Sequence, residues 1–202
     1  MIIAFYKPYG VLSQFTPEPG SSYQPLAAFD LPPEVYPIGR LDADSEGLLL
    51  LTNERHLPAV FLDPDHGHER TYLIQVEGAV TESALSQLRD GVVIRGYRTQ
   101  PCAALMADEP SWLAERVPPI RHRGAIPTSW LQLGLHEGKN RQVRRMTAAV
   151  AFPTLRLIRV AIGKLTLVDL GLGVGEWRVL RDDERLLLAD LPRVADDRER
   201  KS

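Results

Sequence analysis

The strongest constraint on the fold is an uninterrupted aliphatic run, Leu48–Leu51, that directly follows a short polar segment. Four consecutive leucines offer no polar face, so the run predicts a strand that is buried on both sides of a sheet. The preceding segment, Gly39–Gly47, must then lie at the end of that strand. Loops at the ends of rigid strands often carry reactive groups, so Asp42, two residues after Arg40, is the first candidate for chemistry.

The acidic turn around Asp42 has other interpretations. Its first, third, fifth and sixth positions match an EF-hand calcium loop, but the ninth is Leu50 and the twelfth is Asn53 in place of a glutamate. A calcium site is therefore disfavoured. A purely structural role, in which Asp42 accepts hydrogen bonds from turn amides, has about equal weight on spacing alone. A metal-dependent hydrolase built on Asp42, Asp44 and Glu46 would predict inhibition by chelators.

The remaining chain alternates irregularly between strand and helix patterns. Apolar runs bounded by turn residues predict strands over residues 2–6, 72–78 and 129–135. Apolar residues at helical spacing predict short helices over residues 81–88 and 140–150. Many strands interleaved with a few helices indicate an α+β fold.

Basic residues are concentrated in one part of a chain whose net charge is only -2. Residues 116–164 contain ten lysines and arginines against one acid, Glu137, and so carry a charge of +9. Such segregation is typical of a surface that binds a polyanion. The alternative is a set of solvated faces with no ligand.

The pattern of apolar and basic residues in part of this segment predicts an amphipathic helix. At 100° per residue its apolar residues, Val143 and Met146, share one side, whereas Arg141, Arg144 and Arg145 lie on the other. Along the helix these arginines have no acids at pairing distance, so they are available for phosphate or for a distant carboxylate.

Composition favours a cytoplasmic protein over a membrane or secreted one. No apolar run approaches the roughly 20 residues that span a bilayer, and the first residues lack the zones of a secretory signal. Cys102 is the only cysteine, so an internal disulfide is impossible and a reducing, cytoplasmic location is expected.

Three segments, in this order, resemble the motifs of the pseudouridine synthases, in particular of the RsuA-type branch. Gly39–Thr52 is similar to the catalytic-aspartate motif, Arg70–Leu73 to the tyrosine strand, and Glu137–Met146 with Leu157–Gly163 to the third motif. The opening Phe5–Gly10 also fits. The resemblance implies an α+β fold with a mixed, mainly antiparallel central sheet, flanked by a few helices, and a central RNA-binding cleft.

The resemblance also implies an activity, which is isomerisation of a specific uridine in 23S ribosomal RNA to pseudouridine on a flipped-out base, without a metal or organic cofactor. Asp42 would be the catalytic carboxylate, and Tyr72 would stack on the base or its sugar. Arg144 would pair with Asp42 and lower its pKa. The partner would be large-subunit ribosomal RNA, and we expect a monomer. The residues implied in RNA binding are Arg40, Lys139, Asn140, Arg141, Gln142, Arg145 and Arg159.

Most members of this branch carry a small S4-type RNA-binding domain before the catalytic domain. Here the first catalytic strand begins at residue 2, so we expect one catalytic domain over residues 1–190 without an S4 domain. Residues 191–202 form a charged tail with little to bury, which predicts disorder. The alternative function is a non-catalytic RNA-binding or ribosome-assembly module, which would use the basic segment and leave Asp42 without a role.

Overall fold

The computed structural model describes residues 1–62, 68–120, 124 and 126–188. The tail predicted over residues 191–202 therefore lies outside the described residues. The strands of the main sheet are β1 (Ile2–Lys7), β2 (Tyr36–Pro37), β3 (Glu46–Thr52), β4 (Arg70–Glu77), β7 (Ala103–Ala107), β8 (Thr128–Leu135), β9 (Thr154–Ile162), β10 (Leu165–Thr166) and β11 (Trp177–Val179). A separate hairpin pairs β5 (Val93–Ile94) with β6 (Tyr97–Arg98). The helices are η1 (Leu26–Ala28), α1 (Leu57–Leu62), α2 (Glu82–Asp90), α3 (Gln142–Ala149), α4 (Leu167–Leu170) and α5 (Asp182–Leu187).

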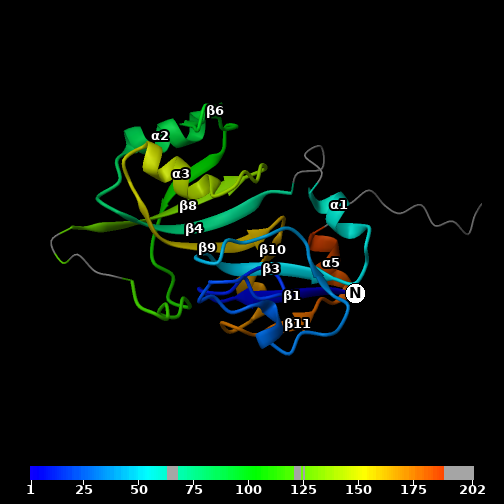
Figure 1. Ribbon diagram of the computed structural model, residues 1–202. Helices are drawn as coiled ribbons and strands as arrows, with labels where there is room; N and C mark the ends of the chain where they lie inside the picture. The colour runs from blue at the N-terminus through cyan, green and yellow to red at the C-terminus, as the bar shows by residue number, and fades with distance from the viewer. Residues whose placement is uncertain (63–67, 121–123, 125, 189–202) are drawn as a thin grey trace, which may run out of the picture.

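The main sheet consists of two antiparallel halves that meet in the middle. Its order is β11-β1-β3-β9-β4-β8-β7, with β2 paired to β3 and β10 paired to β9. The halves join where β3 and β9 run parallel, with Glu46 opposite Ile158 and Gly47 opposite Arg159. Figure 1 shows α2 and α3 together on the half that holds β4 and β8, whereas α1 and α5 lie at the right of the view, near β10 and the end of β3. The predicted α+β fold with a mixed, mainly antiparallel sheet is confirmed.

Gly47 permits the close approach of the two halves. Its φ is +108°, and a Cβ at this position would lie 2.3 Å from the carbonyl oxygen of Arg159. Only glycine adopts this backbone conformation without strain and leaves that space empty. The junction therefore forms directly after the turn that carries Asp42.

The apolar core explains the burial of β3 on both faces. Leu49 and Leu51 pack with β1 and β8 residues in one cluster, and Leu48 and Leu50 pack in a second cluster on the opposite face. All four leucines are fully buried, which confirms the strand predicted from the run Leu48–Leu51. None of the helices within the described ranges is long and apolar enough to cross a membrane.

Candidate active site

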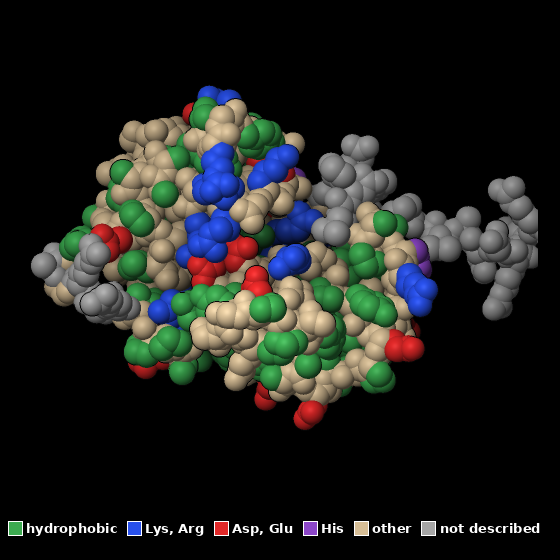
Figure 2. Space-filling view, in the orientation of Figure 1, with side chains coloured by type: hydrophobic (Ala, Val, Ile, Leu, Met, Phe, Trp, Pro, Cys, Tyr) green, Lys and Arg blue, Asp and Glu red, His purple; other side chains and the backbone are tan. Residues whose placement is uncertain are grey.

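A pocket of about 730 Å³ opens at the junction of the two halves of the sheet. Its walls come from the turn before β3, from β4 and β9, and from the loop between β8 and α3. Figure 2 shows lysine and arginine side chains gathered around this hollow, with acidic side chains between them. The volume lies within the range of about 300–1,000 Å³ that is usual for ligand pockets.

The turn that carries Asp42 is held by the segment that follows β1. The hydroxyl of Ser13 accepts a hydrogen bond from the amide of Leu41 (3.0 Å) and donates one to the carbonyl of Leu41 (2.7 Å). The amide of Gly10 donates to the carbonyl of Ala43 (2.8 Å). The backbone on both sides of Asp42 is therefore fixed, while its side chain remains 34% exposed in the pocket wall.

Arginines from the start of α3 meet the carboxylates of this turn. Arg141 donates to both oxygens of Asp44 (3.0 and 2.8 Å), and its Nη1 lies 3.7 Å from Oδ2 of Asp42. The Nε of Arg144 lies 3.4 Å from Oδ2 of Asp44, and Arg144 also donates to the carbonyl of Asp44. Burial acts to raise the pKa of Asp44, but the hydrogen bond from Arg141 and the charges of both arginines outweigh it, so this pKa lies below its ordinary value.

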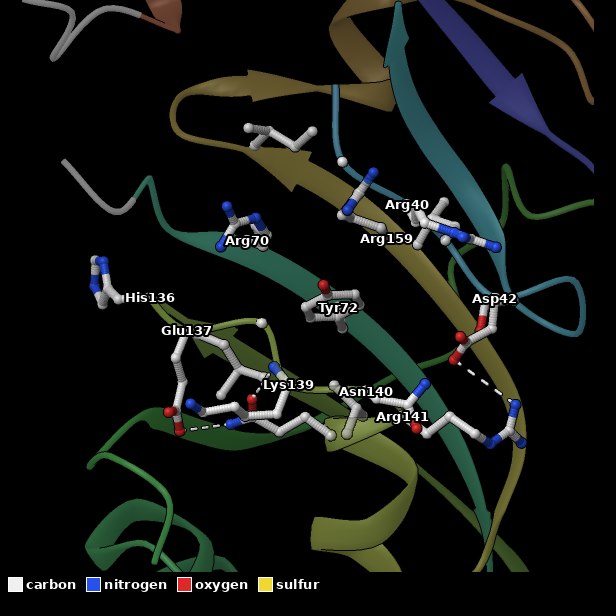
Figure 3. A pocket seen from close by; sticks show the side chains of 18 of the residues that line it. Arg40, Asp42, Arg70, Tyr72, His136, Glu137, Lys139, Asn140, Arg141 and Arg159 are labelled. Carbon is white, nitrogen blue, oxygen red and sulfur yellow. Dashed lines mark hydrogen bonds and ion pairs between the residues drawn. The ribbon is translucent and has the colours of Figure 1, made fainter. Parts of the chain in front are cut away.

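This arrangement differs from the predicted pairing of Asp42 with Arg144. The helix predicted from residue 140 begins at Gln142, and Arg141 is its N-cap in a left-handed conformation (φ 52°). Arg141 therefore leaves the helical arginine face and lies beside Asp42 (Figure 3). Arg144 remains on the helix and binds the neighbouring carboxylate, Asp44.

The third carboxylate of the turn, Glu46, has a separate partner. Its two oxygens accept hydrogen bonds from Nε and Nη2 of Arg156, both at 2.8 Å, and both side chains are buried. Within the described ranges, histidine, cysteine and acidic residues form no group of three that could hold a metal ion. The hydrolase interpretation, which needs Asp42, Asp44 and Glu46 around one metal, finds no support among these residues.

An aromatic side chain and a buried arginine form the middle of the pocket. Tyr72, 9% exposed, lies between Asp42 on one side and Glu137 on the other (Figure 3). Arg159 on β9 is buried, and its Nε donates to the carbonyl of Leu48 (2.8 Å). Burial lowers the pKa of Arg159, and the adjacent Tyr72 acts in the opposite direction.

Glu137 anchors the end of the pocket away from Asp42. It accepts hydrogen bonds from the hydroxyl of Tyr97 (2.6 Å), the amide of Gln100 (2.9 Å) and Nε2 of Gln142 (2.6 Å). Gln142 also accepts a hydrogen bond from the amide of Lys139 (2.8 Å) and is buried. Its side chain therefore holds the loop between β8 and α3, and because Gln142 also lines the pocket, its role as an RNA contact stays a prediction.

The structure brings most of the residues predicted to bind RNA to this pocket. The ones that line it are Arg40, Lys139, Asn140, Arg141, Gln142 and Arg159. Arg145 lies beside it on α3 and donates to the side chain of Asn140 (2.7 Å).

The lining residues to which sequence reasoning assigned no role include Arg70, Tyr97 and His136. Arg70 is two residues before Tyr72 on β4, so the alternation of a strand could have placed both on one face. Tyr97 belongs to a short hairpin that carries no motif, and its position depends on contacts with Glu137, 40 residues away.

Known proteins resemble this chain over most of its length. Residues 1–149 match the family described as RNA pseudouridylate synthase. Ribosomal large subunit pseudouridine synthase E from Xanthomonas axonopodis pv. citri is 52% identical over 163 residues, which cover 81% of this chain and 86% of that protein. The protein of the same name from Vibrio vulnificus is 50% identical over 177 residues, which cover 88% of this chain and 74% of that protein.

A solved structure extends the similarity to the fold. A crystal structure of a pseudouridylate synthase matches with a TM-score of 0.75 and 27% identity over 93% of this chain and 73% of that chain. The segments Ile126–Leu131 and Phe152–Arg159 resemble those of synthase E among the members of this family, in agreement with the relatives found. The chain belongs to the RNA pseudouridylate synthase family.

Proposed function

We propose that this protein converts a uridine of 23S ribosomal RNA to pseudouridine in the central pocket, with Asp42 as the reacting carboxylate. The observation that carries the proposal is the position of Asp42, a partly exposed carboxylate on a fixed turn, 3.7 Å from a guanidinium nitrogen of Arg141. The relatives named for large-subunit ribosomal RNA support this choice of substrate. Motif segments lie on β3, β4 and β9 of one sheet and on α3, which packs against β9, and this supports a single catalytic domain.

The reaction exchanges one glycosidic bond for another. The bond between N1 of uracil and C1′ of ribose breaks, a bond between C5 and C1′ forms, a proton leaves C5, and N1 gains a proton. Asp42 serves as nucleophile or proton acceptor, and Arg141 supplies positive charge beside it. The exchange is an isomerisation in which the changes at C1′ and C5 cancel, so it needs no external oxidant or reductant and the proposal assigns no cofactor.

The target base must leave its stack to reach Asp42. Turning a base out costs a few kcal/mol, and stacking on an aromatic ring returns about 1–3 kcal/mol. Tyr72 in the middle of the pocket provides such a ring. Arg159 lines the same pocket, and its buried Nη2 has no hydrogen-bond partner among the described residues, so it is a donor for the base or its sugar.

Phosphates of the RNA would meet the basic rim of the pocket. The side chains proposed for these contacts share a position on or beside this rim, and they are Arg40, Lys139, Asn140, Arg141 and Arg145. Arg144 is proposed to act through Asp44, by holding the turn next to Asp42. Of the basic residues in the segment 116–164, this arrangement uses Lys139, Arg141 and Arg145 at or beside the pocket.

Release of tritium from C5-labelled uridine in a 23S ribosomal RNA transcript tests the proposal. Asp42→Asn removes the reacting carboxylate but keeps the shape of the side chain, so we expect no release and RNA affinity within about threefold of wild type. Asp108→Asn, at an exposed acid outside the pocket, is the matched control and should release tritium at the wild-type rate. Undiminished tritium release by Asp42→Asn would refute the proposal. If the protein only binds RNA, neither the wild-type protein nor any variant would release tritium.

A further inference from the structure

We propose that Tyr97 forms a second base-binding subsite, which stacks an unpaired base of the RNA at the end of the pocket opposite Asp42. The inference rests on the proposed function in taking RNA as the ligand. It adds a site for a base other than the target uridine.

The position of Tyr97 separates it from the centre of the reaction. Figure 3 shows His136 and Glu137 at one end of the pocket and Asp42 at the other, with Tyr72 between them. Tyr97 is hydrogen-bonded to Glu137 and lines the same pocket from the hairpin of β5 and β6. The single pocket of about 730 Å³ therefore has an aromatic side chain in its middle and another at its far end.

The ring of Tyr97 is partly exposed to solvent, and a positive charge lies over one of its faces. Tyr97 is 37% exposed, whereas Tyr72 is 9% exposed. The Nζ of Lys139 lies 4.7 Å from the centre of the Tyr97 ring. Proteins that hold single-stranded RNA combine these two features, because the ring stacks on a base and the cation contacts the adjoining phosphate.

Hydrogen bonds through Glu137 hold the ring in place before any RNA arrives. Glu137 is the only acid in residues 116–164, a region that otherwise favours a polyanion. Its carboxylate joins the hydroxyl of Tyr97, the amide of Gln100 and the side chain of Gln142, so the hairpin and the basic loop form one unit. A ring that is already oriented loses little side-chain entropy on binding, which strengthens the stacking contact.

The test compares Tyr97→Ala with Tyr97→Phe and Tyr97→Trp in the full chain. The dissociation constant for a 23S ribosomal RNA fragment that contains the target uridine is measured by filter binding at several KCl concentrations. Loss of one stacked base raises Kd about 5- to 150-fold, which corresponds to about 1–3 kcal/mol. We expect this increase for Tyr97→Ala with an unchanged salt slope, because stacking releases no counterions. Tyr97→Phe and Tyr97→Trp keep the ring and should remain within about threefold of wild type.

Tyr36→Ala is the matched control, since Tyr36 is 51% exposed on β2, outside the pocket, and should leave Kd unchanged. Equal weakening by Tyr97→Ala and Tyr97→Phe would show that only the hydroxyl matters and would overturn the subsite. Wild-type affinity of Tyr97→Ala would overturn it as well. Neither outcome touches the proposed function, which fails separately if the wild-type protein releases no tritium from the RNA.

Discussion

The hydroxyl of Ser13 offers a direct way to disturb the position of Asp42 without touching it. Ser13 makes two hydrogen bonds to the backbone of Leu41, the residue before Asp42. Ser129 makes an equivalent pair, because its hydroxyl accepts from the amide of Val80 (3.1 Å) and donates to the carbonyl of Gly78 (2.8 Å). Ser129 does not line the pocket. The main difference between the two serines is therefore the segment that each one holds. Ser13 holds the turn that carries Asp42, and Ser129 holds the segment that follows β4.

The two replacements, Ser13→Ala and Ser129→Ala, should cost similar stability but differ in their effect on catalysis. Each removes two hydrogen bonds worth about 1 kcal/mol each, so the free energy of unfolding in urea should fall by about 2 kcal/mol in both variants. A displacement of about 1 Å at a reacting group can lower a rate about 100-fold. We therefore expect kcat for tritium release to fall about 10- to 100-fold in Ser13→Ala, with KM for the RNA within about threefold of wild type. Ser129→Ala should keep kcat within about twofold.

Either of two results would contradict the claim that the hydrogen bonds of Ser13 position Asp42 for catalysis. A kcat for Ser13→Ala equal to that of wild type would show that the turn holds Asp42 without this serine. An equal loss of kcat in both variants would show that lower stability alone explains the effect. Ser13→Thr keeps a hydroxyl and should recover part of the activity that Ser13→Ala loses.

Three further predictions concern stability, pH and RNA binding. Glu46→Gln leaves the buried guanidinium of Arg156 without a charged partner, so urea unfolding should show a loss of about 3–5 kcal/mol, and an unchanged midpoint would contradict this. Hydrogen bonds from Arg178 lower the pKa of Glu184 from 4.5 to about 2. The contribution of ionised Glu184 to the free energy of unfolding is therefore present above pH 4.5 and disappears as the pH falls toward 2. In thermal melts, the difference in Tm between wild type and Glu184→Gln should therefore be constant above pH 5 and should disappear at lower pH. A difference in Tm that persists at pH 2 would argue against this assignment. Arg145→Ala removes about one phosphate contact, so the slope of log K against log salt should become shallower by about 1, whereas an unchanged slope would remove Arg145 from the interface.

The part of the site that depends on local pattern could be predicted from the sequence. Leu48–Leu51 has no polar face, so a buried strand with Asp42 at its entrance follows from the sequence alone. The strand that carries Tyr72 and the helix with Thr81 as its N-cap were also predicted to within a few residues. These elements are specified by neighbours in the chain.

The parts of the fold and the site that depend on contacts between distant segments could not be predicted from the sequence. The left-handed conformation of Arg141, which gives Asp42 its partner, occurs in a loop held by Glu137 and Gln142. The edge strand β7 contains three alanines and has weak strand preference, but the free edge of β8 supplies its hydrogen bonds. The buried pair of Glu46 and Arg156 joins residues 110 positions apart, which no local pattern reveals.

Mapping pseudouridine across 23S ribosomal RNA tests the central claim most directly. The RNA would come from cells that lack this protein and from the same cells supplied with the wild-type protein or with Asp42→Asn. We expect one uridine position that is modified with the wild-type protein and unmodified in the other two samples. An identical pattern in all three samples, or modification restored by Asp42→Asn, would contradict the claim that Asp42 in the central pocket isomerises this RNA.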